Sequence, residues 1–225
     1  MKPLGLTPWL ILLCACQQQP APAPGAASGP PAIAAPTRAP DSRPALVCFG
    51  DSLTAGLGVD PGKTYPDRLQ QELDRRGYRY RVVNLGESGD TTQDGLERLP
   101  LVAAEMPRIV VLEFGANDGL RGQPVSSTEA NLAQMIEALQ KAGSRVLLAG
   151  ITLPPNYGPE YIRRFNAIYP ALAMRYKLPW IPFLLDGVAG NAALMQRDGL
   201  HPNAQGIPRV VANVLRPLEP LLERK

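Results

Sequence analysis

The sequence is short of cysteine, and this shortage narrows what the chain can do. Only three cysteines occur among its 225 residues, and two of them lie within the first sixteen positions. Cys48, the third, therefore has no partner for a disulfide in the rest of the chain, and a cysteine-based metal site is excluded there. Because Cys48 lies in an apolar run, we expect it to pack as a small buried hydrophobic residue.

The sequence also has little net charge. The whole chain carries +3, from 23 basic and 20 acidic side chains. Setting aside Lys2, Arg38, Arg43 and Asp41, which precede residue 45, leaves 20 basic and 19 acidic residues. This balance gives no argument for a nucleic-acid partner or a strongly acidic one.

Two common catalytic motifs are missing. Gly62-Lys63-Thr64 invites interpretation as a phosphate-binding loop, which needs four residues between its first glycine and the Gly-Lys pair. Gly58 leaves three and Gly56 leaves five, so we do not expect nucleotide binding. The G-x-S-x-G elbow of α/β-hydrolases is absent around both Ser52 and Ser88.

The N-terminal segment is typical of secretion. Lys2 precedes an apolar run that includes residues 9–13 and is too short to span a bilayer as a helix. Residues 13–16 (LCAC) resemble a bacterial lipobox, which implies that residues 1–15 form a lipoprotein signal peptide and that Cys16 carries the lipid. The alternative is an ordinary signal peptide with incidental cysteines.

The next segment predicts a tether between membrane and domain. Residues 20–44 contain eight prolines and eight alanines, which is typical of an extended spacer. Gln17 follows Cys16. In enterobacterial lipoproteins, a residue other than aspartate directly after the lipidated cysteine goes with sorting to the outer membrane. We therefore expect a periplasmic protein anchored to the membrane through residues 16–44, with a single folded domain over residues 45–225.

Apolar runs alternate with helical patterns along this domain. Continuous apolar runs favour parallel strands that are covered on both faces. We predict strands at residues 45–50, 80–85, 109–114 and 146–151, with a weaker one at 180–183. The repeated βα units predict an α/β fold, a doubly wound three-layer α/β/α sandwich with about five parallel strands.

Helical periodicity fills the intervals between these runs. Tyr65, Leu69 and Leu73 recur every four residues after a candidate cap at Thr64, and Gly77 ends the pattern. A second helix would open at a capping box formed by residues 126 and 129. Apolar residues at helical spacing follow there and near the C-terminus: Leu132, Met135, Ile136, Leu139, Val210, Val211, Val214, Leu215 and Leu218.

Chemistry is expected where the strands end, because ligands bind beyond the carboxyl ends of parallel strands. Ser52 follows the first strand, two close glycines follow the second, and Asn117 follows the third. The amide of Asn117 can donate to a developing oxyanion or close an Asx-turn. His201, the only histidine, lies three residues after Asp198, which can orient its ring toward a nucleophile.

Together these stretches resemble the four blocks of the SGNH (GDSL-type) hydrolases, which have a flavodoxin-like fold. The blocks are GDSLTAG (50–56), NLGESGDTT (84–92), GANDG (115–119) and DGLHP (198–202), in the family's order and over nearly all of 45–225. The similarity is greatest to small periplasmic arylesterases, acyl-CoA thioesterases and lysophospholipases. It extends through SGDTTQDGLERLP (88–100), GANDGLRG (115–122) and LPPNYGPEY (153–161).

The resemblance implies a serine esterase or thioesterase that works through an acyl-enzyme. Ser52 would be the nucleophile, His201 the general base and Asp198 the residue that orients it. The oxyanion hole would consist of the backbone N–H of Ser52, the backbone N–H of Gly89 and the side chain of Asn117. No cofactor and no metal is needed, and the partner is an ester substrate.

Several alternatives remain open at this point. Ser88 is a rival nucleophile, and Glu87 departs from the apolar residue common in the subgroup, with a solvent-facing position favoured. The fold also serves carbohydrate O-deacetylases, and an inactive, lipid-tethered binding module is a further possibility. Residues 118–124 and 153–159 are expected to flank the acyl-binding groove. The oligomeric state does not follow from the sequence.

Overall fold

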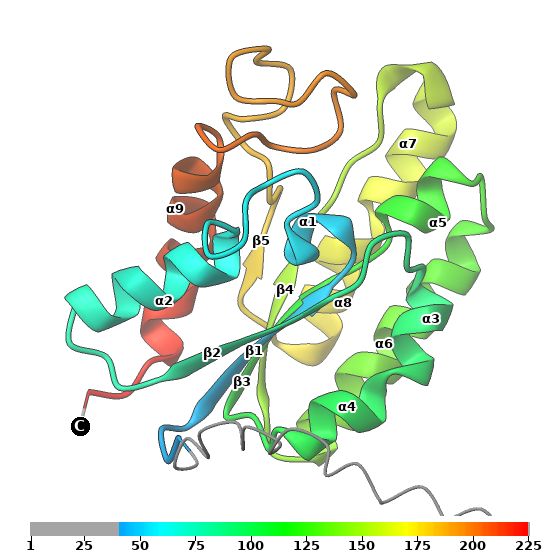
Figure 1. The fold of residues 1–225 in the computed structure, drawn as a ribbon. Coiled ribbons are helices and arrows are strands. Elements are labelled where there is room, and N and C mark those ends of the chain that lie inside the picture. The colour runs from blue at the N-terminus through cyan, green and yellow to red at the C-terminus, as the bar shows by residue number, and fades with distance from the viewer. Residues whose placement is uncertain (1–40, 225) are drawn as a thin grey trace, which may run out of the picture. The chain divides into compact units, whose positions relative to one another are not determined.

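A single parallel sheet forms the centre of the computed structural model, which describes residues 41–224. Its five strands lie in the order β2-β1-β3-β4-β5 (Figure 1). The predicted α/β fold is confirmed, and every strand boundary agrees to within two residues. The strands are β1 (Ala45–Gly50), β2 (Arg81–Gly86), β3 (Ile109–Glu113), β4 (Arg145–Ala149) and β5 (Trp180–Ile181).

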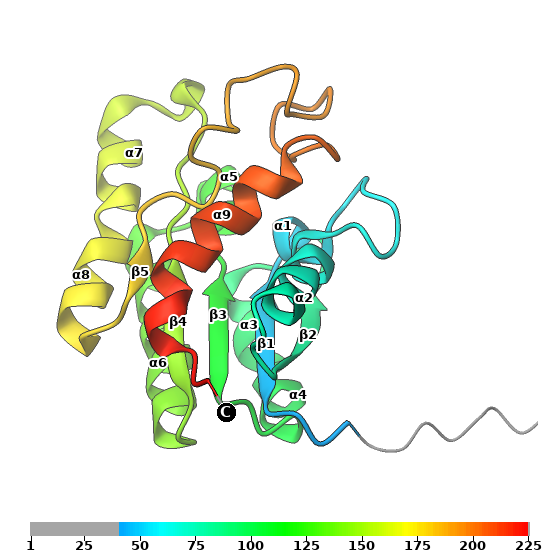
Figure 2. The same ribbon diagram turned by 90° about the vertical axis from the view of Figure 1, so that its left-hand side faces the viewer.

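Helices cover both faces of this sheet (Figures 1 and 2). One face is covered by α2 (Tyr65–Arg75) and α9 (Ile207–Leu218). The other is covered by α3 (Thr92–Glu97), α4 (Leu99–Ala104), α6 (Val125–Lys141) and α8 (Ile168–Tyr176). The short helices α1 (Ser52–Ala55) and α5 (Ala116–Leu120) directly follow strand ends, and α7 (Pro159–Asn166) and two 3₁₀ turns, Pro155–Tyr157 and Glu219–Leu221, complete the set.

The central strands are apolar on both sides because the sheet lies between two layers of helices. All residues of β1 and β3 are buried, whereas those of the edge strand β2 are only partly so. Cys48 is fully buried in β1, as expected, and burial raises the pKa of its thiol to about 12. The thiol is therefore neutral and unreactive at physiological pH.

One predicted helix start is confirmed and the other is wrong. The Thr64 hydroxyl accepts from the Asp67 N–H, and the Asp67 carboxylate accepts from the Thr64 N–H, which forms a capping box for α2. Ser126 and Glu129 instead lie inside α6, which begins at Val125. Pro124 occupies the cap position and starts the helix earlier than the box pattern predicted.

The chain loses regular structure between Ile181 and Ile207. These intervening residues contain turns and a single isolated bridge between Met195 and Pro202, and they carry both Asp198 and His201.

No helix within residues 41–224 has the length and apolar character needed to cross a membrane. The expected signal peptide, Cys16 and the spacer up to residue 40 lie outside the described residues.

Candidate active site

Ser52 lies on a tight turn at the carboxyl end of β1. Asp51 precedes it and caps α1 by accepting a hydrogen bond from the Leu53 N–H at 3.0 Å. The turn lies against Gly86 at the end of β2, where a Cβ atom would come within 2.1 Å of the Ala55 nitrogen. This close approach requires glycine at position 86. Ser52 itself is mostly buried, with 9% of its surface exposed.

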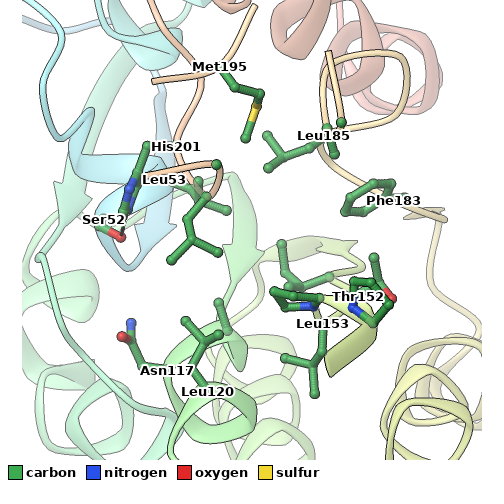
Figure 3. A pocket seen from close by; sticks show the side chains of 18 residues that line it. Ser52, Leu53, Asn117, Leu120, Thr152, Leu153, Phe183, Leu185, Met195 and His201 are labelled. Atoms are coloured by element: carbon green, nitrogen blue, oxygen red, sulfur yellow. Dashed lines mark hydrogen bonds between the residues drawn. The ribbon is translucent and has the colours of Figure 1, made fainter. Parts of the chain in front are cut away.

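The side chains of Ser52, His201 and Asp198 form one hydrogen-bonded series, of which Figure 3 shows Ser52 and His201. Ser52 Oγ lies 2.8 Å from His201 Nε2, although 149 residues separate them in the sequence. On the other side of the ring, Nδ1 lies 2.7 Å from Asp198 Oδ2. A base within hydrogen-bond distance of a hydroxyl, itself held by a carboxylate, is the arrangement that activates a serine.

Asp198 is held by its own loop. Its Oδ1 accepts from the backbone N–H groups of Leu200 at 2.9 Å and His201 at 3.1 Å. Partial burial acts to raise the pKa of Asp198, but the hydrogen bonds from the His201 ring and from these two N–H groups outweigh it. The net effect lowers this pKa, so the carboxylate remains ionised at neutral pH and faces the ring as an acceptor.

Of the remaining predicted site groups, Asn117 lines the cavity beside the serine, and Gly89 lies one residue before the hydrogen-bond partner of Asn117. Asn117, in α5, faces the same cavity as Ser52 (Figure 3), and its Nδ2 donates to the Asp90 carbonyl at 2.9 Å. Gly89 precedes that residue and has a φ of +93°, which favours glycine. Within residues 41–224, neither the Ser52 nor the Gly89 backbone N–H donates to another protein group.

A largely apolar cavity of about 530 Å³ opens beside Ser52 and His201. Residues 118–124 contribute only Leu120 to its lining, and residues 153–159 contribute Leu153 to Pro155. The facing wall has no signal in the sequence, because the irregular segment that supplies it has no periodicity. Figure 3 shows this wall: Phe183, Leu185 and Met195.

The two residues that raised alternatives in the sequence face outward. Glu87 and Ser88 are both exposed, and neither lines the cavity next to His201. The solvent-facing interpretation of Glu87 therefore agrees with its position. Ser88 has no imidazole beside it, since the only histidine contacts Ser52.

Two carboxyl groups that the sequence analysis did not single out are buried beneath the nucleophile turn. Glu113, at the end of β3, accepts through Oε2 from the Asp51 N–H at 3.3 Å and the Thr54 hydroxyl at 2.8 Å. Its Oε1 has no hydrogen-bond partner among the described residues. Burial raises the pKa of Asp51 to about 6, and burial together with the charge of Asp51 raises that of Glu113 well above its usual value.

These raised pKa values predict how stability depends on pH. The folded state keeps protons that the unfolded chain has lost, so the free energy of unfolding should fall as pH rises above about 4. Glu113→Gln keeps an acceptor for Asp51 and Thr54 without a titrating group. The decline between pH 5 and pH 8 should therefore be smaller in this variant, by on the order of 1 kcal/mol for each pH unit over which Glu113 keeps its extra proton.

Urea unfolding of both proteins at the two pH values measures this difference. Parallel pH profiles would contradict a proton held on Glu113. Glu223→Gln, which changes a largely exposed carboxylate paired with Arg145, serves as the control and should leave the profile of the parent chain nearly unchanged.

Comparison with known proteins agrees with this geometry. Residues 48–207 match the GDSL-like Lipase/Acylhydrolase family. Esterase TesA of Pseudomonas aeruginosa is 48% identical over 178 residues, which is 79% of this chain and 89% of that protein. Thioesterase 1/protease 1/lysophospholipase L1 of Escherichia coli K12 is 40% identical, and the match covers 79% of this chain and 84% of that protein. An arylesterase of Vibrio mimicus is also 40% identical, over 77% of this chain and 87% of that protein.

Solved structures give the same result. The crystal structure of TesA superposes with a TM-score of 0.77 at 47% identity and covers 79% of this chain and 99% of that one. The structure of the psychrotrophic esterase EstA from Pseudoalteromonas gives a TM-score of 0.75 at 31% identity and covers 78% of this chain and 97% of that one. With a family match over most of its length and relatives at 40–48% identity, the chain belongs to the GDSL-like lipase/acylhydrolase family and is an ester hydrolase.

Proposed function

We propose that this hydrolase works through an acyl-enzyme on Ser52. The observation that carries the proposal is the unbroken series from Ser52 Oγ through His201 to Asp198, with separations of 2.8 and 2.7 Å, at the mouth of an apolar cavity. His201 acts as the general base, and Asp198 orients its ring and stabilises the imidazolium. Gly89 and Asn117 complete the oxyanion hole with the N–H of Ser52.

The reaction has two steps. As Ser52 Oγ bonds to the carbonyl carbon, its proton passes to His201 Nε2, and the carbonyl oxygen becomes an oxyanion. Collapse of this intermediate breaks the bond to the alcohol or thiol, which leaves with the proton from His201. Water then loses a proton to His201 and attacks the carbonyl carbon of the acyl-enzyme. The bond to Ser52 Oγ breaks, His201 returns the proton to Oγ, and the carboxylic acid leaves.

The apolar cavity favours substrates with an acyl chain. Aryl esters, acyl thioesters and lysophospholipids all present such a chain, and each buried methylene contributes about 0.8 kcal/mol. Catalytic efficiency, kcat/KM, should therefore rise about fourfold for each added methylene until the cavity is filled. The acetyl group of an O-acetylated sugar would leave most of this wall unused, which makes the deacetylase alternative less suited to the site.

A panel of p-nitrophenyl esters from acetyl to palmitoyl, with an acetylated sugar for comparison, tests this proposal on the full chain.

Leu120→Trp would place a larger side chain in the cavity. We expect it to keep kcat/KM for the acetyl ester within about threefold and to lower the decanoyl value at least tenfold. A preference for the acetylated sugar, or an unchanged chain-length profile in Leu120→Trp, would contradict the acyl-chain assignment.

We further propose that the protein is exported, lipidated on Cys16 and held in the periplasm at the outer membrane. Lys2, the short apolar run after it and the LCAC sequence support this placement. Cys16→Ser should release the protein from the membrane fraction and remove incorporation of labelled palmitate. An unchanged membrane fraction in that variant would contradict lipid anchoring.

A further inference from the structure

Arg98 links the segments that surround the nucleophile, although it lies outside the cavity. It lies between α3 and α4, in the run 88–100 that the sequence analysis singled out without assigning a role to this residue. Its Nη2 donates to the Gly50 carbonyl at 3.2 Å and its Nη1 to the Leu85 carbonyl at 3.0 Å, so it joins the ends of β1 and β2. Its Nε donates to Asp90 Oδ2 at 2.6 Å.

The surroundings of this guanidinium make the arrangement specific to arginine. The side chains of Arg98 and Asp90 are only 21% and 13% exposed. The cation also packs on two aromatic rings, with its Cζ 4.9 Å from the centroid of Phe49 and 5.9 Å from that of Phe114. A lysine would keep the charge but lose the planar fork that reaches a carboxylate and two carbonyls at once.

Two of the hydrogen bonds of Arg98 lead to groups next to the proposed oxyanion hole. Gly50 lies two residues before Ser52, and Asp90 directly follows Gly89. The Asp90 carbonyl in turn accepts from Asn117 Nδ2 at 2.9 Å. Arg98 thus joins the segments that carry two of the donors directly, and it reaches the third, Asn117, through Asp90.

We propose that Arg98 is a positioning residue for the oxyanion hole. This rests on the proposed roles of Ser52, Gly89 and Asn117. The donors must surround the oxyanion of the transition state, whereas the acyl chain is held by the separate apolar wall. Loosening their spacing should therefore lower kcat and leave KM almost unchanged.

Two substitutions of Arg98 measure this effect. Misplacing a reacting group by about 1 Å can cost about 100-fold in rate, and losing one donor costs about 10²–10³-fold. We expect kcat to fall about tenfold in Arg98→Lys and about 100-fold in Arg98→Met, with KM within threefold of the parent. Affinity for a trifluoromethyl ketone, whose adduct carries an oxyanion, should weaken by the same factors.

Arg81 provides a matched control at the opposite end of β2. It is similarly part-buried at 25% exposure, pairs with Glu105 at 2.6 Å and donates to the Glu105 backbone carbonyl at 3.1 Å. Arg81→Met removes a comparable ion pair and backbone contact far from the donors. Its melting temperature should fall, but kcat measured well below that temperature should stay within twofold of the parent.

The outcomes separate this proposal from the one on which it rests. Inactivity of the parent chain toward every ester in the panel would overturn the proposed function itself. Full kcat in folded Arg98→Lys and Arg98→Met, or an equal loss in Arg81→Met, would overturn the positioning role alone. If Arg98→Met does not fold, Arg98→Lys and its ketone affinity still decide the question.

Discussion

Replacing Ser52 by alanine is expected to lower kcat by about 10⁶-fold, to the background of the assay. In serine hydrolases, removal of the nucleophile costs about this much, because no other group can form the acyl-enzyme. The remaining donors and the cavity can still bind substrate, so KM should change far less than kcat. Comparison of the ester hydrolysis rates of purified Ser52→Ala and the parent enzyme measures the loss of kcat.

Ser88→Ala is the matched control. Ser88 is exposed and has no contact with His201, so this variant should keep kcat within about twofold of the parent. A fluorophosphonate should label the parent once per chain, on the peptide that contains Ser52, and should not label Ser52→Ala. Retention of one hundredth of the activity in Ser52→Ala, or labelling of the Ser88 peptide, would contradict the assignment of the nucleophile.

Removing the base should have an effect of similar size. His201→Ala leaves the Ser52 hydroxyl without the group that lies 2.8 Å from it, so we expect kcat to fall by about 10⁶-fold. Because nucleophile and base act as a unit, the double variant with Ser52→Ala should be no slower than either single variant. A multiplicative loss in the double variant would show that the two side chains do not act together.

Asp198→Asn should reduce the rate less than His201→Ala. In enzymes with a buried triad, amide substitution of the aspartate costs about 10⁴-fold by favouring the wrong imidazole tautomer. Here the Asp198 side chain is 41% exposed, so water can take over part of its role and we expect about 10²-fold. Asp186→Asn, on the same irregular segment but paired with Arg209, should leave kcat unchanged and serves as the control.

Most of the fold and the candidate site could be predicted, because the polar residues of the site follow the points where the apolar runs of the strands end. The apolar runs of β1 and β3 marked buried strands, and Ser52 and Asn117 follow within two and four residues of their ends. The histidine was singled out by its uniqueness and by an aspartate three residues before it. Thr64 was a sound helix cap because its partner Asp67 lies within the first turn, so the signal is wholly local.

The parts that sequence reasoning missed depend on contacts between distant residues. Glu113 interrupts the apolar run of β3, yet its burial depends on Asp51 and Thr54, about sixty residues earlier. Arg98 has the sequence appearance of an ordinary charged helix residue, and only the converging strand ends show its role. The wall formed by Phe183, Leu185 and Met195 belongs to a segment whose path is set by packing rather than by backbone pattern.

The irregular stretch between β5 and α9 has a consequence for how activities of this kind diversify. It carries Asp198 and His201 together with Phe183, Leu185 and Met195, while the proposed nucleophile, Ser52, follows the end of β1. Exchanging this one continuous stretch between homologous genes, with crossovers near residues 182 and 206, would transfer the proposed base, the carboxylate that orients it and part of the apolar wall at once. Recombinants of this type should acquire the donor's substrate preference while the recipient's serine and amide donors stay in place.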